Sequence, residues 1–365
     1  MFPGTTANSR GPLSLMLPRS PGYLLTFLVT ITGSLALTTS AAAQVGFETV
    51  GTRAQGMAGA FVAVADDATA TYWNPAGLAS IPIFDLALGF GQLEQPSPSP
   101  APTGSGTQAW RGSNSSIAIG LPALGVSYFR LRLAQALDPS AEASLNGREM
   151  NNAAVLARNA TAGSIGVTLV QSLTDAVVIG STLRLTRVSA ASAAFDTRQL
   201  SEALDAADDL EGDCETKFDA DLGVMLYLGP ARVGLTVRNL VAPTWDANPQ
   251  APVEAERLAR VGVAFGRGPV RGRRVWSMAV DADLTTAEAP DGERRSLAAG
   301  AERWFRRSRL AVRGGVRAQT IGDVRPVATG GASVGIWSGL LLEGQVTLGG
   351  DEVERGWGVG ARVTF

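Results

Sequence analysis

Few side chains of this 365-residue chain could carry catalytic or metal chemistry. There is no histidine, which excludes Ser-His-Asp and Cys-His catalysis and any histidine-ligated metal. The only cysteine, Cys214, cannot form an internal disulfide. It is either a reactive or bridging thiol or an unreactive loop residue, and its acidic, polar surroundings favour the second. We therefore expect no enzyme activity, no bound metal and no cofactor.

Charged residues recur instead on one face of segments in which apolar and polar residues alternate. Met278 and Val280, for example, alternate with Ser277, Ala279 and Asp281. Successive side chains of a strand point to opposite faces of its sheet, so this period of two predicts strands with one apolar and one polar face. Both signs of charge occur on the polar faces, so they can pair across neighbouring strands. In the closed barrel predicted below, ten charged residues of these polar faces are expected to face the lumen: Arg184, Arg238, Arg260, Asp281, Asp283, Glu302, Arg313, Arg317, Glu343 and Arg362.

Such alternating segments fill the chain from residue 83 to residue 365. Most have 10 to 12 residues, about the length that a tilted strand needs to cross a bilayer. Long and short connections alternate between them, and every proline after Ile83 lies in a connection, as a closed ladder of strands requires. The 14 predicted strands are 83–92, 114–121, 124–133, 161–171, 175–187, 217–228, 231–241, 257–266, 274–285, 295–305, 308–319, 327–337, 339–348 and 356–365.

The predicted fold is all-β: a transmembrane, antiparallel, up-and-down β-barrel of about 14 strands with a short N-terminal plug. A soluble β-sandwich shows the same alternation, with its apolar faces turned inward. Strand length, the rhythm of the connections and the N-terminus favour the barrel. Residues 1–43 are expected to be a cleaved signal peptide, with an apolar run over 23–37 and an Ala41-Ala42-Ala43 exit. Met1 and Met16 are the two candidate translation starts.

Residues 44–82, between the signal peptide and the barrel domain at 83–365, have a different sequence pattern. Alternation breaks down, glycines permit close backbone approach, and Asp66 and Asp67 are placed to cap a short helix reaching Thr71 or Trp73. Asn74-Pro75 should end that helix and begin another turn. A barrel of 14 strands is too wide for its own side chains to fill, so we expect this segment to plug it. The alternative is a lead-in at the periplasmic rim. The candidate plug residues are Gly56, Gly59, Asp66, Asp67, Trp73, Asn74, Pro75 and Gly77.

The same stretch, GTRAQGMAGAFVAVADDATATYWNPAGLA at 51–79, resembles the N-terminal signature of the PorV/PorQ proteins and of the wider FadL superfamily of outer-membrane transport proteins. Softer matches are VGLTVRNL at 233–240, VDADLT at 280–285 and the run at 297–318. The resemblance implies a 14-stranded barrel with an N-terminal hatch that includes Asn74, Pro75 and Gly77.

Two functions follow from this resemblance. The first is transport of small hydrophobic molecules past the plug, and the alternative is a secretion or assembly accessory, similar to PorV, that docks a protein of a secretion system. Either one predicts a bacterial outer-membrane barrel in contact with membrane lipid, with both termini in the periplasm. A net charge of −2 gives no basic face for nucleic acid.

Three surface features carry further expectations. The acidic stretch 201–215 is interpreted as a solvated outer loop, with a divalent-cation or lipopolysaccharide-bridging site as the alternative. Residues 96–102 form a stiff proline-rich loop. Arg303, Arg306 and Arg307 are expected near lipid head groups, with Trp304 and Phe305 in an aromatic girdle. The terminal Phe365 resembles the signal read by the barrel-assembly machinery.

Overall fold

The computed structural model describes ten stretches of the chain. The predicted signal peptide, the proline-rich loop, Arg306 and Arg307 lie outside them. The described residues are 50–95, 107–137, 155–195, 200–248, 252–268, 275–289, 292–305, 309–322, 324–350 and 354–365.

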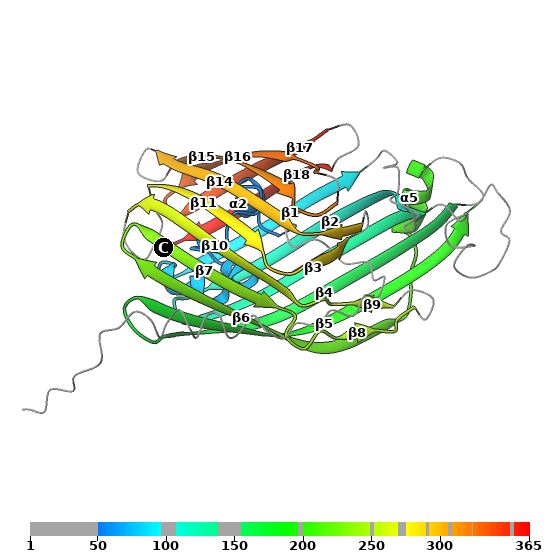
Figure 1. Cartoon of the computed structure of the whole chain (residues 1–365), viewed down its shortest axis with the longest axis horizontal. Helices are drawn as coiled ribbons and strands as arrows, with labels where there is room; N and C mark the ends of the chain where they lie inside the picture. The colour runs from blue at the N-terminus through cyan, green and yellow to red at the C-terminus, as the bar shows by residue number, and fades with distance from the viewer. Residues whose placement is uncertain are drawn as a thin grey trace, which may run out of the picture. The chain divides into compact units, whose positions relative to one another are not determined.

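Fourteen long strands form one closed antiparallel barrel, in which the first strand pairs with the last (Figure 1). This confirms the predicted fold class, and each predicted strand has a counterpart. The strands are β1 (Asp85–Gln95), β2 (Thr107–Gly120), β3 (Leu124–Leu137), β4 (Val155–Ser172), β5 (Val177–Phe195), β6 (Cys214–Leu228), β7 (Ala231–Arg238), β10 (Leu258–Arg267), β11 (Trp276–Asp283), β14 (Ser296–Phe305), β15 (Leu310–Gln319), β16 (Val327–Trp337), β17 (Leu340–Gly349) and β18 (Arg355–Thr364).

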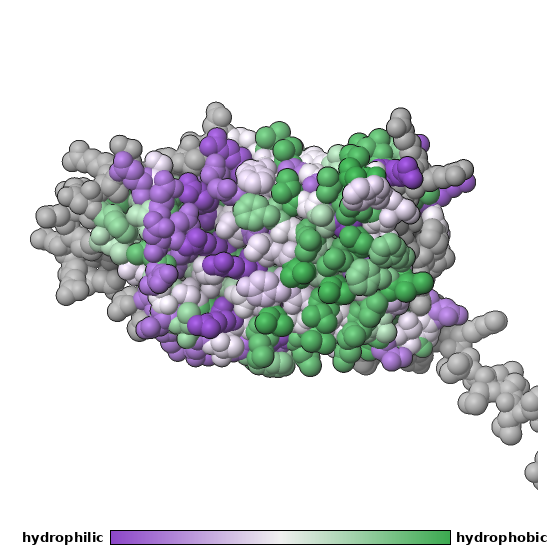
Figure 2. All heavy atoms as spheres, turned by 180° about the vertical axis from the view of Figure 1, so that it is seen from behind, coloured by the Kyte–Doolittle hydropathy of each residue, from purple (hydrophilic) through white to green (hydrophobic). Residues whose placement is uncertain are grey.

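The outward faces of these strands carry a belt of exposed apolar side chains. In β11, for example, Met278 and Val280 are 60% and 50% exposed, whereas Ser277 and Asp281 between and beyond them are buried. Figure 2 shows this hydrophobic band next to a hydrophilic zone on one face of the molecule. An apolar exterior on a closed barrel with a polar interior is what a membrane-spanning barrel requires. No helix in the described parts of the chain is long and apolar enough to cross a membrane.

Three elements lie in connections that the sequence predicts to be irregular. Two are small hairpins, β8 (Thr244–Trp245) with β9 (Val253–Glu254) and β12 (Ala287–Ala289) with β13 (Gly292–Arg294). The third is helix α5 (Leu200–Asp208), so the prediction of a solvated loop across 201–215 is wrong for its first half. Cys214 is exposed and begins β6 rather than lying in the loop.

Helix α5 packs against the outside of the barrel wall. Its Ala203, Leu204 and Ala207 are buried against alanines of β2, β3 and β4, among them Ala136 and Ala157. These wall residues share the outward face of their strands, because Ala136 pairs with Ala157 across β3 and β4. The small apolar side chains give the helix a surface to bury, which explains why an acidic stretch becomes ordered.

The strand ends near the chain termini meet at one end of the barrel, opposite the longest connections. Phe84 and Phe365 exchange backbone hydrogen bonds of 3.3 and 3.0 Å, and their rings lie 6.3 Å apart. The expectation that Trp304 belongs to an aromatic girdle is wrong: it is buried with Ala311 and Leu341 inside the wall. It lies two residues after the inward-facing Glu302 and therefore shares its face. Phe305, on the opposite face, is exposed.

Candidate functional site

Residues 50–82, here called the inner segment, lie inside the barrel. Almost all of them are buried, and their contacts reach strands around its circumference. Where the segment passes closest, the wall has glycine: a Cβ on Gly180 of β5 would lie 2.5 Å from Ala76 N, and one on Gly315 of β15 would lie 2.5 Å from the carbonyl carbon of Met57. Glycine in a strand interior commonly marks such an approach of another backbone.

Local sequence explains the course of the segment. Helix α2 (Thr52–Gln55) follows Gly51, which has φ of 83°, and the turn after it uses Gly59 at φ of 82°. Helix α3 (Ala70–Trp73) ends before Asn74-Pro75, and the 3-10 helix η3 (Pro75–Ser80) starts with that proline, as the sequence predicts. The Asn74 side chain accepts a hydrogen bond from Ala76 N.

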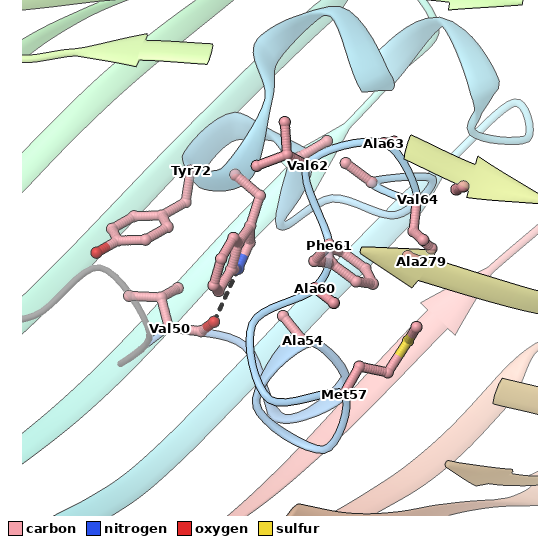
Figure 3. Packing of buried hydrophobic residues seen from close by; sticks show 14 of the residues in the cluster. Val50, Ala54, Met57, Ala60, Phe61, Val62, Ala63, Val64, Tyr72 and Ala279 are labelled. Atoms are coloured by element: carbon pink, nitrogen blue, oxygen red, sulfur yellow. Dashed lines mark hydrogen bonds between the residues drawn. The ribbon is translucent and has the colours of Figure 1, made fainter. Parts of the chain in front are cut away.

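The interior of the segment is a compact apolar cluster. Phe61 and Trp73 are fully buried and meet edge to face, with ring centroids 6.0 Å apart. Trp73 Nε1 donates a hydrogen bond of 2.9 Å to the carbonyl of Val50, drawn as a dashed line in Figure 3. The side chain of Met57 lies in the same cluster (Figure 3). Fifteen of the 21 buried residues in this cluster belong to the segment, and six, mostly alanines such as Ala279, belong to the wall, so the segment supplies most of this core.

A buried arginine joins this segment to the wall. Arg53 in α2 contacts Asp66 at 2.5 Å and Asp67 at 3.0 Å, both within the segment, and donates to both carboxylate oxygens of Glu302 on β14 at 2.8 and 2.6 Å. All four side chains are at most 3% exposed. Both carboxylates face Arg53, but Asp67 Oδ1 also accepts a hydrogen bond of 3.0 Å from Thr69 N in the turn that leads into α3. The predicted capping is therefore seen for Asp67 at that turn and not for Asp66, which contacts arginines.

Further cations surround the same two aspartates. Arg362 of β18 lies 3.0 Å from Asp67, and Arg232 of β7 lies 3.7 Å from Asp66. Burial alone would raise the pKa of Asp67, but Arg53 and Arg362 outweigh it and hold that pKa below its usual range. Asp67 therefore stays ionised and paired with the wall.

Backbone amides of the segment are also bound by the wall. One carboxylate oxygen of Asp281 accepts hydrogen bonds from Phe61 N at 2.8 Å and Val62 N at 2.7 Å. The Asn74 amide donates to the carbonyls of Val62 and, on β6, Val224. Of the candidate plug residues, Asp66, Asp67 and Asn74 thus make polar contacts with the wall, and all eight are buried in the inner segment.

The ten charges predicted for the lumen all lie on the inward face of the wall, and most pair there. Arg184 contacts Asp219 at 2.6 Å, Arg260 contacts Asp283 at 2.5 Å, and Arg313 lies 3.6 Å from Glu302. The remaining pairs are Arg238 with Asp221, Arg317 with Glu354, and Arg362 with Glu343. Within the described residues, no group of three or more acidic or cysteine side chains could hold a metal ion.

Beside the inner segment the lumen holds a pocket with a cavity volume of about 110 Å³. Tyr72 of the inner segment forms one side of it, and Trp245 and Val253 of the β8–β9 hairpin form another. Its other apolar side chains come from the wall: Phe129, Leu131, Ala160, Ala162, Val188 and Leu258. Its polar lining includes Ser164, Arg184, Thr186, Arg238 and Asn239.

Aromatic rings held by wall residues lie on two sides of the pocket. The Arg238 guanidinium lies 3.7 Å from the centroid of the Tyr72 ring, which holds that ring against the wall. Trp245 is buried, and its Nε1 donates to the carbonyl of Thr186 at 3.3 Å. Tyr72 therefore forms the boundary of the pocket on the side of the inner segment, and the β8–β9 hairpin forms a second boundary.

Several residues of this site are not among those predicted from the sequence. Arg53 and Tyr72 lie within the quoted N-terminal stretch, but nothing in its spacing indicates their partners. Asp219 and Asp221 share the alternating polar face of β6 and could have been found by that period. Trp245 lies in a connection, where no period indicates its position.

Among comparisons with known proteins, the solved structures support the barrel fold. The profile of the family described as "F plasmid transfer operon, TraF, protein" matches residues 109–283, which is less than half of the chain. No match was found among curated proteins. Among solved structures, the monoaromatic hydrocarbon channel CymD matches with a TM-score of 0.61 and 12% identity, over 88% of this chain and 99% of its own.

Two further structures are similar. The toluene transporter TodX of P. putida gives a TM-score of 0.56 at 12% identity, over 88% of this chain and 99% of its own. A FadL homologue of Pseudomonas aeruginosa gives 0.56 at 11% identity, over 89% of this chain and 100% of its own. At these identities the likeness establishes that this chain shares their barrel fold, and function must be argued from the site.

Proposed function

We propose that this chain is an outer-membrane barrel that admits small hydrophobic molecules, with the inner segment as its plug. The observation that carries the proposal is the largely apolar pocket between Tyr72 of that segment and the β8–β9 hairpin. An apolar cavity of about 150 Å³ in another protein binds benzene, so a cavity of about 110 Å³ is in the size range of a single small ring.

The proposed orientation follows from the connections. Short turns face the periplasm and long loops face outward in bacterial barrels. The end of the barrel at which β1 begins and β18 ends is therefore the periplasmic end in this proposal. A solute would then enter under the β8–β9 hairpin, rest in the pocket, and pass when the inner segment moves. The similar folds of hydrocarbon channels and a toluene transporter support this class of solute.

The test is uptake of toluene by cells in which this chain is the only route. Ala162→Trp should fill the pocket from β4 and lower the uptake rate at least about tenfold, because the ring occupies the volume that the solute needs. Ile165→Trp is the matched control on the same strand, since Ile165 is 60% exposed on the outward face.

A deletion of residues 51–82 gives the second arm of the test. Uptake should rise or lose its selectivity for size when the plug is absent, provided that the barrel still assembles. The proposal fails if Ala162→Trp transports toluene as well as Ile165→Trp does, or if the deletion leaves uptake unchanged.

A further inference from the structure

Two exposed arginines lie at the edge of the apolar belt, on its long-connection side. Arg130 of β3 and Arg187 of β5 are each the register partner of Gly163 on β4, so they flank a position without a side chain. Both are exposed on the outward face, and neither has an ion-pair or hydrogen-bond partner among the described residues. With strands about 4.8 Å apart, their Cα atoms are separated by about 10 Å.

The next row of outward side chains, one step from the arginines toward the end of the barrel where β1 begins, is entirely apolar or aromatic. It runs through Leu88, Ile117, Tyr128, Ile165, Leu185 and Phe218, which are between 39% and 60% exposed. The belt therefore ends abruptly at the two arginines. In a membrane-spanning barrel this boundary lies where lipid acyl chains give way to head groups.

A shallow groove on the lipid-facing wall leads up to Arg130. It has a volume of about 350 Å³, and the outward side chains that line it include Leu88, Phe90, Ile117 and Val359. At its upper end it is bounded by Tyr128 and by Ser115, the cross-strand partner of Arg130. An apolar groove that ends beside two cations matches a molecule with an acyl chain and an anionic head.

Neighbouring arginines on the same face are already neutralised by α5. Arg111 contacts Asp205 at 2.9 Å and Asp208 at 3.2 Å, and Arg132 lies 3.5 Å from Asp208. Helix α5 thus supplies counter-charges for Arg111 and Arg132, which lie farther from the apolar belt. It supplies none for Arg130 and Arg187, which lie next to the belt. Arginine pairs well with phosphate because its planar fork can donate two parallel hydrogen bonds.

We propose that Arg130 and Arg187, with the groove over β18, β1, β2 and β3, bind the phosphate head group and an acyl chain of a membrane lipid. The site depends on the barrel lying in a membrane and is independent of what the lumen transports.

The experiment measures lipid binding to the detergent-purified full chain by native mass spectrometry. The probes are dioleoyl phosphatidic acid, dioleoyl phosphatidylcholine and inorganic phosphate. A cation near a membrane surface contributes about 1 kcal/mol to binding an anionic lipid, so Arg130→Gln and Arg187→Gln should each weaken phosphatidic acid binding about fivefold, and the double variant about 25-fold. Ser115→Glu should match Arg130→Gln, because its carboxylate would pair with Arg130 across the strands.

Arg355→Gln is the control, since Arg355 is an exposed outward arginine on β18 that is already paired with Glu94 at 3.2 Å; it should change binding less than twofold. A heat-dependent gel shift establishes that each variant is folded. Equal binding of the two lipids, or an unchanged double variant, would overturn the proposal. Inorganic phosphate binding as tightly as phosphatidic acid would show a free-anion site instead, and displacement of the lipid by toluene would assign the groove to the transported solute.

Discussion

The most direct test of the inner segment is to remove the cation at its centre. Arg53→Met keeps the length of the side chain and its contact with Phe61, whose ring centroid lies 5.1 Å from the guanidinium. It leaves Asp66, Asp67 and Glu302 without their nearest cation, although Arg232, Arg362 and Arg313 remain 3.7, 3.0 and 3.6 Å away. Removing one partner of a buried ion pair costs about 3 to 5 kcal/mol, and the remaining arginines place this case at about 3.

That cost should appear as opening of the segment rather than as unfolding of the barrel, because the strands keep their own hydrogen bonds. At 1.4 kcal/mol per tenfold change, about 3 kcal/mol raises the open population about 100-fold. The assay is maleimide labelling of Ala60→Cys in a Cys214→Ser background, since Ala60 is fully buried in the closed segment. Its labelling rate reports the open population.

Arg303→Met is the matched control, an arginine on the exposed outward face of β14 that should leave the rate unchanged. Adding Glu302→Gln to Arg53→Met should then have little further effect, because both changes break the same link between segment and wall. A rate within threefold of the parent, in a barrel that still shows its heat-dependent gel shift, would refute the claim that Arg53 holds the segment.

Two further predictions use the same labelling assay. Because the pKa of Asp67 is held below its usual range, its contribution to closure is fully present above about pH 3.9 and is lost as the pH falls through the lower folded-state pKa. The labelling rate of Ala60→Cys is divided at each pH by that of the exposed Cys214 in the parent, because the thiolate fraction itself rises with pH; a ratio that increases from pH 5 to 8 would contradict this sign. Gly315→Ala places a methyl group against the backbone of Met57 and should raise the labelling rate at least about tenfold, whereas Gly330→Ala on β16 meets no atom within 4 Å and should not; equal rates would show that the close approach is unimportant.

The strands could be predicted from sequence because apolar and polar side chains alternate along every strand of a membrane barrel. Each residue of β11, for instance, faces either lipid or lumen, so Met278 and Asp281 differ in type for a reason that acts on every strand. The sequence predicts the start of β4 too late, at 161 instead of Val155, and the end of β5 too early, at 187 instead of Phe195. These outer parts leave the apolar belt: Ala157 faces α5, and Val188 faces the lumenal pocket. In these outer parts the side chains still alternate between the two faces, but the two faces no longer differ clearly in polarity.

Long-range partners could not be predicted in the same way. Arg53 and Glu302 are 249 residues apart, and only the closure of the barrel brings them together. The same holds for α5, whose apolar residues have a partner only after β3 and β4 have paired. Trp304 shows the opposite failure: its face was fixed by alternation with Glu302, but its aromatic character suggested a girdle at the surface.

The chemistry of the contact between segment and wall bears on whether the segment can move. Buried ion pairs are weak evidence for stability, because two charges lose their hydration when they pair. The same fact makes them suitable for a reversible contact: when Arg53 separates from Glu302 in a lumen that admits water, both charges regain hydration, whereas separated apolar surfaces gain nothing. Most of the buried apolar cluster, including Phe61 and Trp73, belongs to the segment, and the six wall residues that join it are mainly alanines. The other contacts with the wall are made by charges, amides and glycines. This division favours a unit that can shift within the barrel without losing its own core.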